Sequence, residues 1–319
     1  MTCRTCPEQD GSARGAEFQC GGKELLAEIA ASARRTDDGV RFWKAGSPSG
    51  VPALFLPGAG WTGAQGLFLA DALPEFSWHL LDLPGIAGSV PLACADARGF
   101  SQWLHTFCAS EGIVRPHLVG HSLGGYLALS AAAQGMPLRS LALIDGGLAP
   151  LAVPQSLGMI AYAVPLVVAL DRLTAGALVA RRPGKPSTES AESAEEIAER
   201  FHLPISEELR RACEDCSRQG EAWDLDGSVQ QRLGLIGVQT RTGAALARVK
   251  APVLAIIALH PRGEKWLHER AAKAISVLSA LPHVHVVETQ TGHYPFWEDP
   301  QGFADALRAF YRDGEDQRR

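Results

Sequence analysis

The sequence predicts an α/β fold with a mostly parallel central sheet covered by helices on both faces. Short apolar runs of strand length alternate with longer runs that have helical spacing. The strand-like runs are apolar, as expected for strands that are buried on both faces. The alternation breaks between residues 146 and 250, where helical patterns continue without a clear strand. We therefore expect a helical insertion before the penultimate strand.

The individual elements follow in a regular order. A helical spacing at residues 23–35 and a short strand at residues 41–43 come first. The strand-like runs that follow are residues 52–56, 78–83, 117–119, 140–144, 253–259 and 284–287. The helix-like runs are residues 64–73, 96–110, 124–134, 264–281 and 301–312. A helix or the insertion thus separates each of these strands from the next, which favours parallel pairing.

The chain of 319 residues is long enough for one large α/β domain with an insertion. We expect the core to comprise residues 23–146 and 250–315, with residues 147–249 as the insertion. Residues 1–22 are rich in Gly, Cys and charge, and we expect them to form a disordered leader. They contain no apolar core, which argues against a secretory signal peptide.

Composition excludes several classes of protein. The formal charge of −5 gives no basic footprint for nucleic acid. Seven cysteines at irregular spacing do not suggest a disulfide framework, so a reducing, cytoplasmic location is expected. Three closely spaced sets of possible metal ligands are each incomplete, and we expect no metal site. These sets are Cys3/Cys6, Cys213/Cys216 and His283/His285.

One apolar segment is long enough to suggest a membrane span. Residues 147–170 contain no charged side chain. However, Pro150, Pro154 and Pro165 interrupt the run. We therefore expect no stable membrane span but an apolar lid over a lipophilic pocket. The partner expected for such a pocket is a small hydrophobic molecule.

The most informative motif is Gly-His-Ser-Leu-Gly-Gly at residues 120–125, between a strand-like and a helix-like run. A serine on such a strand–turn–helix corner is pushed out of the sheet surface. Ser122 would then sit at a helix N-terminus, among free backbone N–H groups. Gly120 and Gly124 keep the turn free of side-chain clashes. This context predicts a nucleophilic serine.

From about residue 40 to residue 312 the chain resembles the α/β-hydrolase superfamily. The resemblance rests on four motifs in sequence order. They are Leu-Pro-Gly-Ala-Gly at residues 56–60, Asp-Leu-Pro-Gly at 82–85, the serine motif at 120–125, and Thr-Gly-His-Tyr-Pro at 291–295. The resemblance implies that the insertion at residues 147–249 is a helical cap. It also implies a Ser-His-acid triad that uses no metal or cofactor.

Each implied role has a physical reason. Ser122 needs a base to take its proton, and a histidine with a pKa of about 6.5 suits that task. His293 follows the last predicted strand, so a parallel sheet would place it at the same edge as Ser122. Two backbone N–H groups stabilise the oxyanion in this family. The resemblance assigns them to Leu123, which follows the serine, and to Ala59, in the loop after the first core strand.

The acid of the triad has two candidates. The superfamily usually places it about nine residues past a proline that starts the penultimate strand, and counting from Pro252 gives Pro261. Glu264 lies three residues later and would serve if the loop folds back. Asp145 ends the strand-like run 140–144, where some families of the superfamily place their acid. Asp145 also has a purely structural interpretation, as the cap of the following turn.

The expected function is that of a serine hydrolase. It would cleave a carboxylic ester, thioester or lactone with an apolar moiety through an acyl-enzyme intermediate. Trp61 and His121 are the candidates for residues that line the substrate pocket. The same catalytic residues would also serve a C–C bond hydrolase or an acyltransferase. A non-catalytic receptor or scaffold of the same fold is the alternative from another class.

Overall fold

The computed structural model describes residues 33–87, 89, 92, 96–149, 193–223, 233–234, 236–237, 240–263 and 265–316. In this part of the chain an eight-stranded sheet forms in the order β1-β2-β4-β3-β5-β6-β7-β8. The strands are β1 (Arg34–Arg35), β2 (Arg41–Gly46), β3 (Val51–Leu56), β4 (Phe76–Leu81), β5 (His117–His121), β6 (Ser140–Ile144), β7 (Val253–Ala258) and β8 (Val284–Thr289).

The sheet is parallel over most of its width, as predicted. Strands β3 to β8 all pair in parallel with their neighbours. Only β2, against β4, and β1, against β2, pair antiparallel among the described strands. Every residue of β5, β6 and β7 is buried. This burial explains why these strands read as continuous apolar runs and show no alternation.

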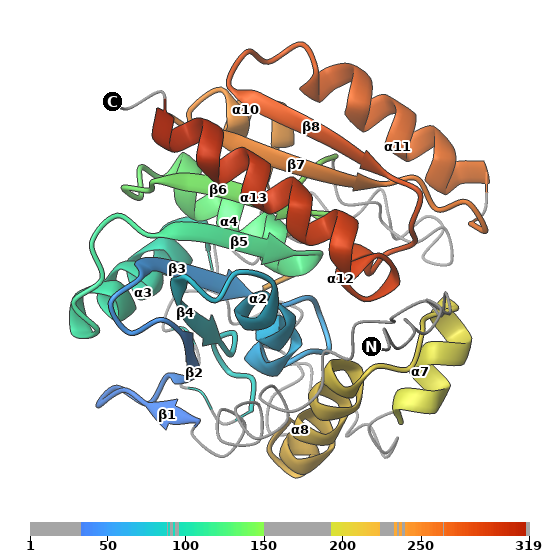
Figure 1. Cartoon of the computed structure of the whole chain (residues 1–319). Helices are drawn as coiled ribbons and strands as arrows, with labels where there is room; N and C mark the ends of the chain where they lie inside the picture. Colours follow the sequence, from blue (N-terminus) through green and yellow to red (C-terminus); the bar gives the residue numbers. More distant parts are fainter. Residues whose placement is uncertain are drawn as a thin grey trace, which may run out of the picture.

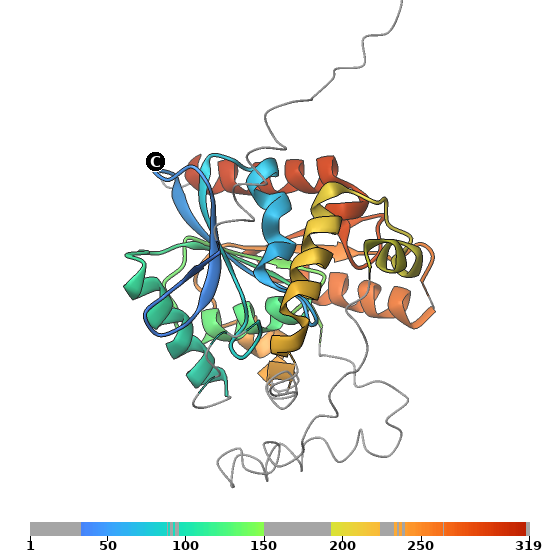
Figure 2. The same cartoon turned by 90° about the horizontal axis from the view of Figure 1, so that it is seen from below.

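Helices cover both faces of the sheet (Figures 1 and 2). Figure 2 shows α3, α4 and α11 along one face and α2 and α13 along the other. The described helical elements are η1 (Gly63–Gly66), α2 (Leu67–Ala72), α3 (Ala97–Ser110), α4 (Leu123–Ala133), α7 (Ala194–Phe201), α8 (Glu207–Trp223), α10 (Thr242–Leu246), α11 (Lys265–Leu278), α12 (Pro295–Glu298) and α13 (Pro300–Asp316).

The sheet divides the apolar interior into two clusters. One lies under α3, α4 and α11 and includes Phe100, Phe107 and Leu127. The other lies under α2 and α13 and includes Phe68 and Phe303. Because each buried strand contributes side chains alternately to the two clusters, the sheet is fixed from both sides.

The inserted segment between β6 and β7 is helical in its described part. Helix α7 packs against α8, and α8 contacts η1 and α2 of the core. Helix α10, near the end of the insertion, packs against α4. The expected domain limits at residues 147 and 249 remain predictions. The leader at residues 1–22, and the expected lid from residue 150 onward, lie outside the described residues.

Two of the predicted helices differ from the structure. The helix expected at residues 23–35 is described only from residue 33, and Arg34–Arg35 there is a strand paired with β2. A two-residue strand is too short to show a periodic pattern in the sequence. The helix expected at residues 64–73 is split into η1 and α2. A Cβ at Gly66 would lie 2.4 Å from the ring of Phe55. Because Gly66 has no side chain, the backbone of η1 packs directly against this ring of the sheet.

Crossing a bilayer takes a helix of about 20 mostly apolar residues. Among the helices that the structure describes, none has both that length and that apolar character.

Candidate active site

Ser122 stands at the corner between β5 and α4, where the sequence motif predicts it. Its backbone has φ 50° and ψ −118°, a conformation that a residue with a side chain adopts only when its surroundings enforce it. A Cβ at Gly124 would lie 2.1 Å from the carbonyl oxygen of Leu56, and one at Gly120 would lie 2.4 Å from that of Gly124. The two glycines therefore let β3, β5 and α4 approach closely enough to hold the strained turn.

The structure brings three of the predicted side chains into contact. The Ser122 Oγ lies 3.0 Å from Nε2 of His293, and Nδ1 of His293 lies 2.6 Å from Oδ2 of Asp145. A carboxylate only accepts hydrogen bonds, so Nδ1 of the ring donates to Asp145. In the neutral ring Nε2 then accepts the serine hydroxyl. Glu264, the alternative acid, lies outside the described residues.

The three side chains meet because their strands run parallel in the same part of the sheet. Ser122, Asp145 and His293 follow β5, β6 and β8, whose carboxyl ends lie at one edge of the sheet. Asp145 has φ 39°, and its N–H donates to the carbonyl oxygen of Ile256 at 3.0 Å. This bond and the strained backbone fix where its side chain leaves the sheet edge.

Asp145 has a second histidine partner that the sequence analysis did not identify. Nε2 of His260, in the loop after β7, lies 3.2 Å from the same Oδ2 that binds His293. Burial by itself would raise the pKa of Asp145. The hydrogen bonds from His260 and His293 outweigh the burial and hold that pKa well below its usual range. Asp145 is therefore a carboxylate throughout the physiological range of pH.

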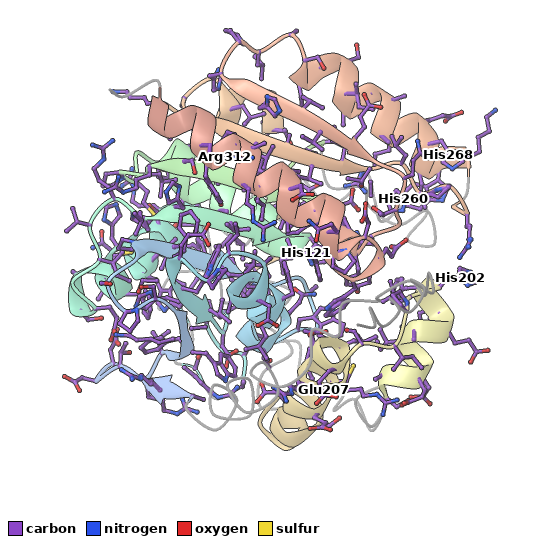
Figure 3. All side chains as sticks on the ribbon, viewed as in Figure 1. His121, His202, Glu207, His260, His268 and Arg312 are labelled. Carbon is purple, nitrogen blue, oxygen red and sulfur yellow. The ribbon has the colours of Figure 1, made fainter. Side chains whose placement is uncertain are left out.

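His121 is the last residue of β5 and directly precedes Ser122 (Figure 3). It is fully buried, and burial lowers its pKa to about 3, so the ring is neutral. Its Nε2 donates to the backbone carbonyl of His293 at 2.8 Å. The ring is therefore enclosed and supports the His293 loop, and its expected place in the substrate pocket stays a prediction.

Gln65 supports the loop after β3. Its Oε1 accepts the backbone N–H of Gly58 at 2.8 Å, and the same oxygen is 3.3 Å from Nδ1 of His121. Because Nε2 of the neutral His121 ring carries the proton, Nδ1 has none to donate, and the 3.3 Å contact is not a hydrogen bond. Gln65 thus orients the loop through Gly58.

The two predicted oxyanion donors lie at the start of α4 and in the loop after β3. The N–H of Leu123 is the first of α4, where helix geometry provides no acceptor. Ala59 is exposed in the loop between β3 and η1. Neither N–H is paired with an acceptor in the part of the chain that the structure describes.

Trp61, the other predicted pocket residue, belongs to an aromatic cluster beside this loop. Its Nε1 donates to the hydroxyl of Tyr294 at 3.3 Å, and its ring packs edge-on against Trp297. Phe201 of α7 also packs edge-on against Tyr294. Trp61 is buried, with only 6 % of its surface exposed. The cluster therefore joins α7 to the segment that carries His293.

A buried charged cluster, which the sequence analysis also missed, connects α8 to the core. Arg41 of β2 lies 2.9 Å from Asp82 and 2.7 Å from Asp215 of α8. The Thr62 hydroxyl donates to Asp215 at 2.7 Å, and the Gly63 N–H donates to Asp82 at 2.7 Å. Burial raises the pKa of Asp82 to about 7, although the charge of Arg41 opposes this. The cluster ties α8 to the start of η1, next to Ala59.

Of the three incomplete ligand pairs, the structure describes Cys213/Cys216 and His283/His285. Cys213 and Cys216 are buried on α8, and burial raises the pKa of their thiols to about 11 and about 12. Cys3 and Cys6 lie outside the described residues. In the described part of the chain, no three His, Cys, Asp or Glu side chains are arranged to hold a metal ion.

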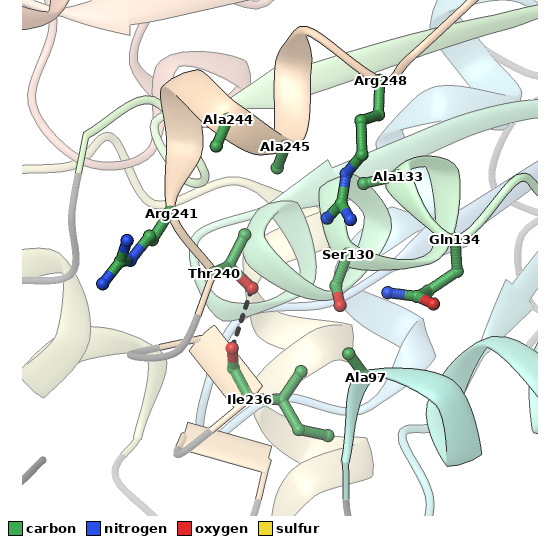
Figure 4. Close-up of a pocket in the computed structure, with 10 residues that line it drawn as sticks. All are labelled: Ala97, Ser130, Ala133, Gln134, Ile236, Thr240, Arg241, Ala244, Ala245 and Arg248. Carbon is green, nitrogen blue, oxygen red and sulfur yellow. Dashed lines mark hydrogen bonds between the residues drawn. The ribbon is translucent and has the colours of Figure 1, made fainter.

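A separate cavity lies near the other end of α4 (Figure 4). Its volume is about 410 Å³. Ser130 and Gln134 line it from α4, and Thr240, Arg241 and Arg248 line it from the opposite side. None of the predicted catalytic side chains is among its lining residues.

This fold and site define a class of protein. The chain belongs to the alpha/beta hydrolase family, whose model matches residues 53–306. A relative from Escherichia fergusonii, 2-succinyl-6-hydroxy-2,4-cyclohexadiene-1-carboxylate synthase, is 34% identical over 105 residues. This match covers 33% of the present chain and 41% of the relative, so it spans about two fifths of the relative's length.

Two solved structures show the same fold. One is E-2-(acetamidomethylene)succinate hydrolase, with a TM-score of 0.61 and 21% sequence identity, covering 88% of this chain and 99% of the other. The second is a carboxylesterase from Bacillus subtilis, with a TM-score of 0.57 and 16% identity, covering 91% of this chain and 95% of the other. At these identities the likeness concerns the fold alone.

Proposed function

We propose that this protein is a serine hydrolase in which Ser122 is the nucleophile, His293 the general base and Asp145 the acid. One observation carries the proposal: the unbroken chain of hydrogen bonds from Ser122 through His293 to Asp145, at 3.0 Å and 2.6 Å. Both distances lie within the reach that proton transfer requires. Membership of a hydrolase-fold family is consistent with it.

The reaction begins with attack of the Ser122 Oγ on a carbonyl carbon. As the new C–O bond forms, Nε2 of His293 takes the hydroxyl proton, and the ionised Asp145 stabilises the resulting imidazolium. The N–H groups of Leu123 and Ala59 stabilise the oxyanion. Collapse of this intermediate breaks the bond to the leaving group, which receives the proton from His293. Water, activated by His293, then releases the acyl group and restores Ser122.

The proposed substrate is a carboxylic ester, thioester or lactone with an apolar moiety. The uncharged run at residues 147–170 supports the apolar part, because in the sequence it follows β6 directly and opens the insertion. The aromatic cluster of Trp61 and Tyr294 makes the surroundings of the Ala59 loop apolar. Nothing in the proposed chemistry requires a metal or a cofactor, because the proton acceptor and the oxyanion donors are protein groups.

The relatives favour a second candidate. The Escherichia fergusonii protein is named as a synthase of a cyclohexadiene carboxylate, and a solved neighbour is named as a hydrolase of a substituted succinate. A reaction that makes or breaks a bond other than an ester would use the same Ser122, His293 and Asp145. In that case the same base acts, and the substrate decides which bond changes.

The deciding experiment uses p-nitrophenyl esters of increasing acyl length and a fluorophosphonate probe. The wild-type protein is expected to label at Ser122 and to prefer hexanoyl or longer esters, while Ser122→Ala does neither. Exposed His285→Ala, on β8 but away from the site, is the matched control. A preference for acetate would contradict the apolar substrate. A folded protein that fails to label at Ser122 would contradict the hydrolase itself and favour a non-catalytic receptor.

A further inference from the structure

Four neighbouring strands deliver one side chain each to the carboxyl edge of the sheet. In spatial order β5 is followed by Ser122, β6 by Asp145, β7 by His260 and β8 by His293. The Asp145 side chain must therefore reach past the end of β7 to meet His293. The residue that stands at this crossing point is His260. The proposed hydrolysis uses one histidine, so a second one on the same carboxylate calls for an explanation.

Among the described residues, the side chain within hydrogen-bond distance of the His260 imidazole is that of Asp145. Its Nε2 lies 3.2 Å from Asp145 Oδ2, and its side chain is 11 % exposed. Because the carboxylate only accepts, Nε2 of His260 is the donor. The ring also lies parallel to that of His293, with centroids 6.5 Å apart and planes at 22°. One carboxylate oxygen is thus held from two sides by two nearly parallel imidazoles.

The backbone of His260 is fixed in a conformation that aims the ring. Its φ is 51°, in the left-handed region where a side chain is strained. Three hydrogen bonds hold it there. The His260 N–H donates to the carbonyl oxygen of Thr291 at 2.9 Å, and the His260 carbonyl accepts from Gly263 N–H and His268 Nε2, both at 2.7 Å. Strain that is over-determined in this way marks a residue whose orientation matters.

We propose that His260 is a positioning residue: its Nε2–H holds Asp145 Oδ2 in line with Nδ1 of His293. The inference rests on the triad proposed above. Without the second donor, the carboxylate would keep a single side-chain hydrogen bond and would rotate about its own side-chain torsions. His293 would then lose the fixed partner that sets its tautomer and ring orientation. His260 does not contact the reacting atoms itself.

Three variants separate positioning from packing. His260→Ala removes the donor, and His260→Gln keeps one, because the glutamine Nε2 lies about as far along the side chain as the imidazole Nε2. His285→Ala is the matched control, an exposed histidine on β8. The measurements are kcat and KM with a p-nitrophenyl ester, the rate of fluorophosphonate labelling of Ser122, and the low-field proton resonance of the His293 Nδ1–H bond. Thermal unfolding accompanies each variant.

In His260→Ala we expect kcat and the labelling rate to fall about tenfold, as for other losses of an orienting partner, with KM changed less than about twofold. The Nδ1–H resonance should shift or broaden, because it reports the Asp145–His293 bond directly. His260→Gln should recover most of the rate, and His285→Ala should behave like the wild type.

Two outcomes would overturn the inference. In one, His260→Ala keeps its rate and its resonance unchanged. In the other, the alanine and glutamine variants lose rate and thermal stability equally, which would mean that the ring matters only for packing. The resonance also separates this inference from the proposed function. If the wild type neither labels nor turns over esters, the hydrolase proposal fails, while a shifted resonance in His260→Ala still supports the positioning role.

Discussion

Three of the six non-glycine residues that have positive φ in the described part of the chain lie at the sheet edge that carries the proposed triad. Ser122, Asp145 and His260 all have positive φ, at 50°, 39° and 51°. Each strained residue lowers the free energy of unfolding by about 1–3 kcal/mol and persists only where the surrounding structure holds it. Here each of the three donates its backbone N–H to a neighbouring strand or loop. The strain at these three positions thus lowers the stability of the fold, and the same backbone conformations bring three side chains together at one point.

Asp145→Asn tests the acid at this scale. The asparagine keeps the size of the side chain but lacks the charge that stabilises the His293 imidazolium, and it favours the wrong ring tautomer. We expect kcat to fall by about a hundredfold or more. Ester hydrolysis at saturating substrate is the measurement. Glu264→Gln, the matched change at the alternative acid, should leave kcat within about twofold. The reverse pattern would make Glu264 the acid.

At the scale of elements, both buried charge and apolar packing attach α8 to the core. Asp215 is the α8 member of that attachment, and both Arg41 and Thr62 contact it. Removing one partner of a buried pair leaves the other charge uncompensated, which is more costly than losing an exposed pair. The position of α8 next to Ala59 therefore depends on three elements that are distant in sequence.

Asp215→Asn should lower the free energy of unfolding by about 3 kcal/mol, the range found for breaking a buried ion pair. Urea unfolding at neutral pH measures this. Glu207→Gln is the control on the same helix, because the Glu207 carboxylate is half exposed and an i,i+4 pair such as Glu207–Arg211 contributes about 0.5 kcal/mol. Equal, small effects of the two changes would show that the cluster does not hold α8.

At the scale of the whole molecule, buried neutral histidines link stability to pH. His79 of β4 is 4 % exposed and stacks near Phe42. Burial, helped by the charge of Lys44, lowers its pKa to about 4. In the unfolded chain its pKa is about 6.5, so below that pH the unfolded chain binds a proton that the folded protein does not. This histidine therefore makes the folded protein less stable as the pH falls from about 6.5 to 4.

His79→Phe removes this titration and keeps an aromatic ring in the core. Relative to the wild type, the variant should gain about 3 kcal/mol of unfolding free energy at pH 4 compared with neutral pH. Denaturant unfolding at several pH values gives this difference. His285→Ala, an exposed histidine, should run parallel to the wild type at all pH values. If the unfolding free energy of His79→Phe also changes with pH as that of the wild type does, His79 takes up its proton in the folded protein as it does in the unfolded chain.

Much of the fold was predictable because it is local. The predicted strand at residues 140–144 matches β6. The predicted helix at 96–110 differs from α3 by one residue at its start, and the one at 124–134 differs from α4 by one residue at each end. In each case the apolar period reports burial directly. The prediction failed where tertiary packing overrides the local pattern, at Arg34–Arg35, whose pairing with β2 has no sequence signature, and at η1, which is flattened against Phe55.

The sequence by itself determined the α/β alternation, the serine corner and the histidine after the last strand, because each depends on a few consecutive residues. It favoured Asp145 as the acid and kept Glu264 as the alternative, and it pointed to neither His260 nor the Arg41–Asp82–Asp215 cluster. Only the tertiary structure decided which carboxylate meets His293. The reason is physical: those contacts join side chains more than a hundred residues apart, and the register of parallel strands, which no local pattern encodes, sets where they meet.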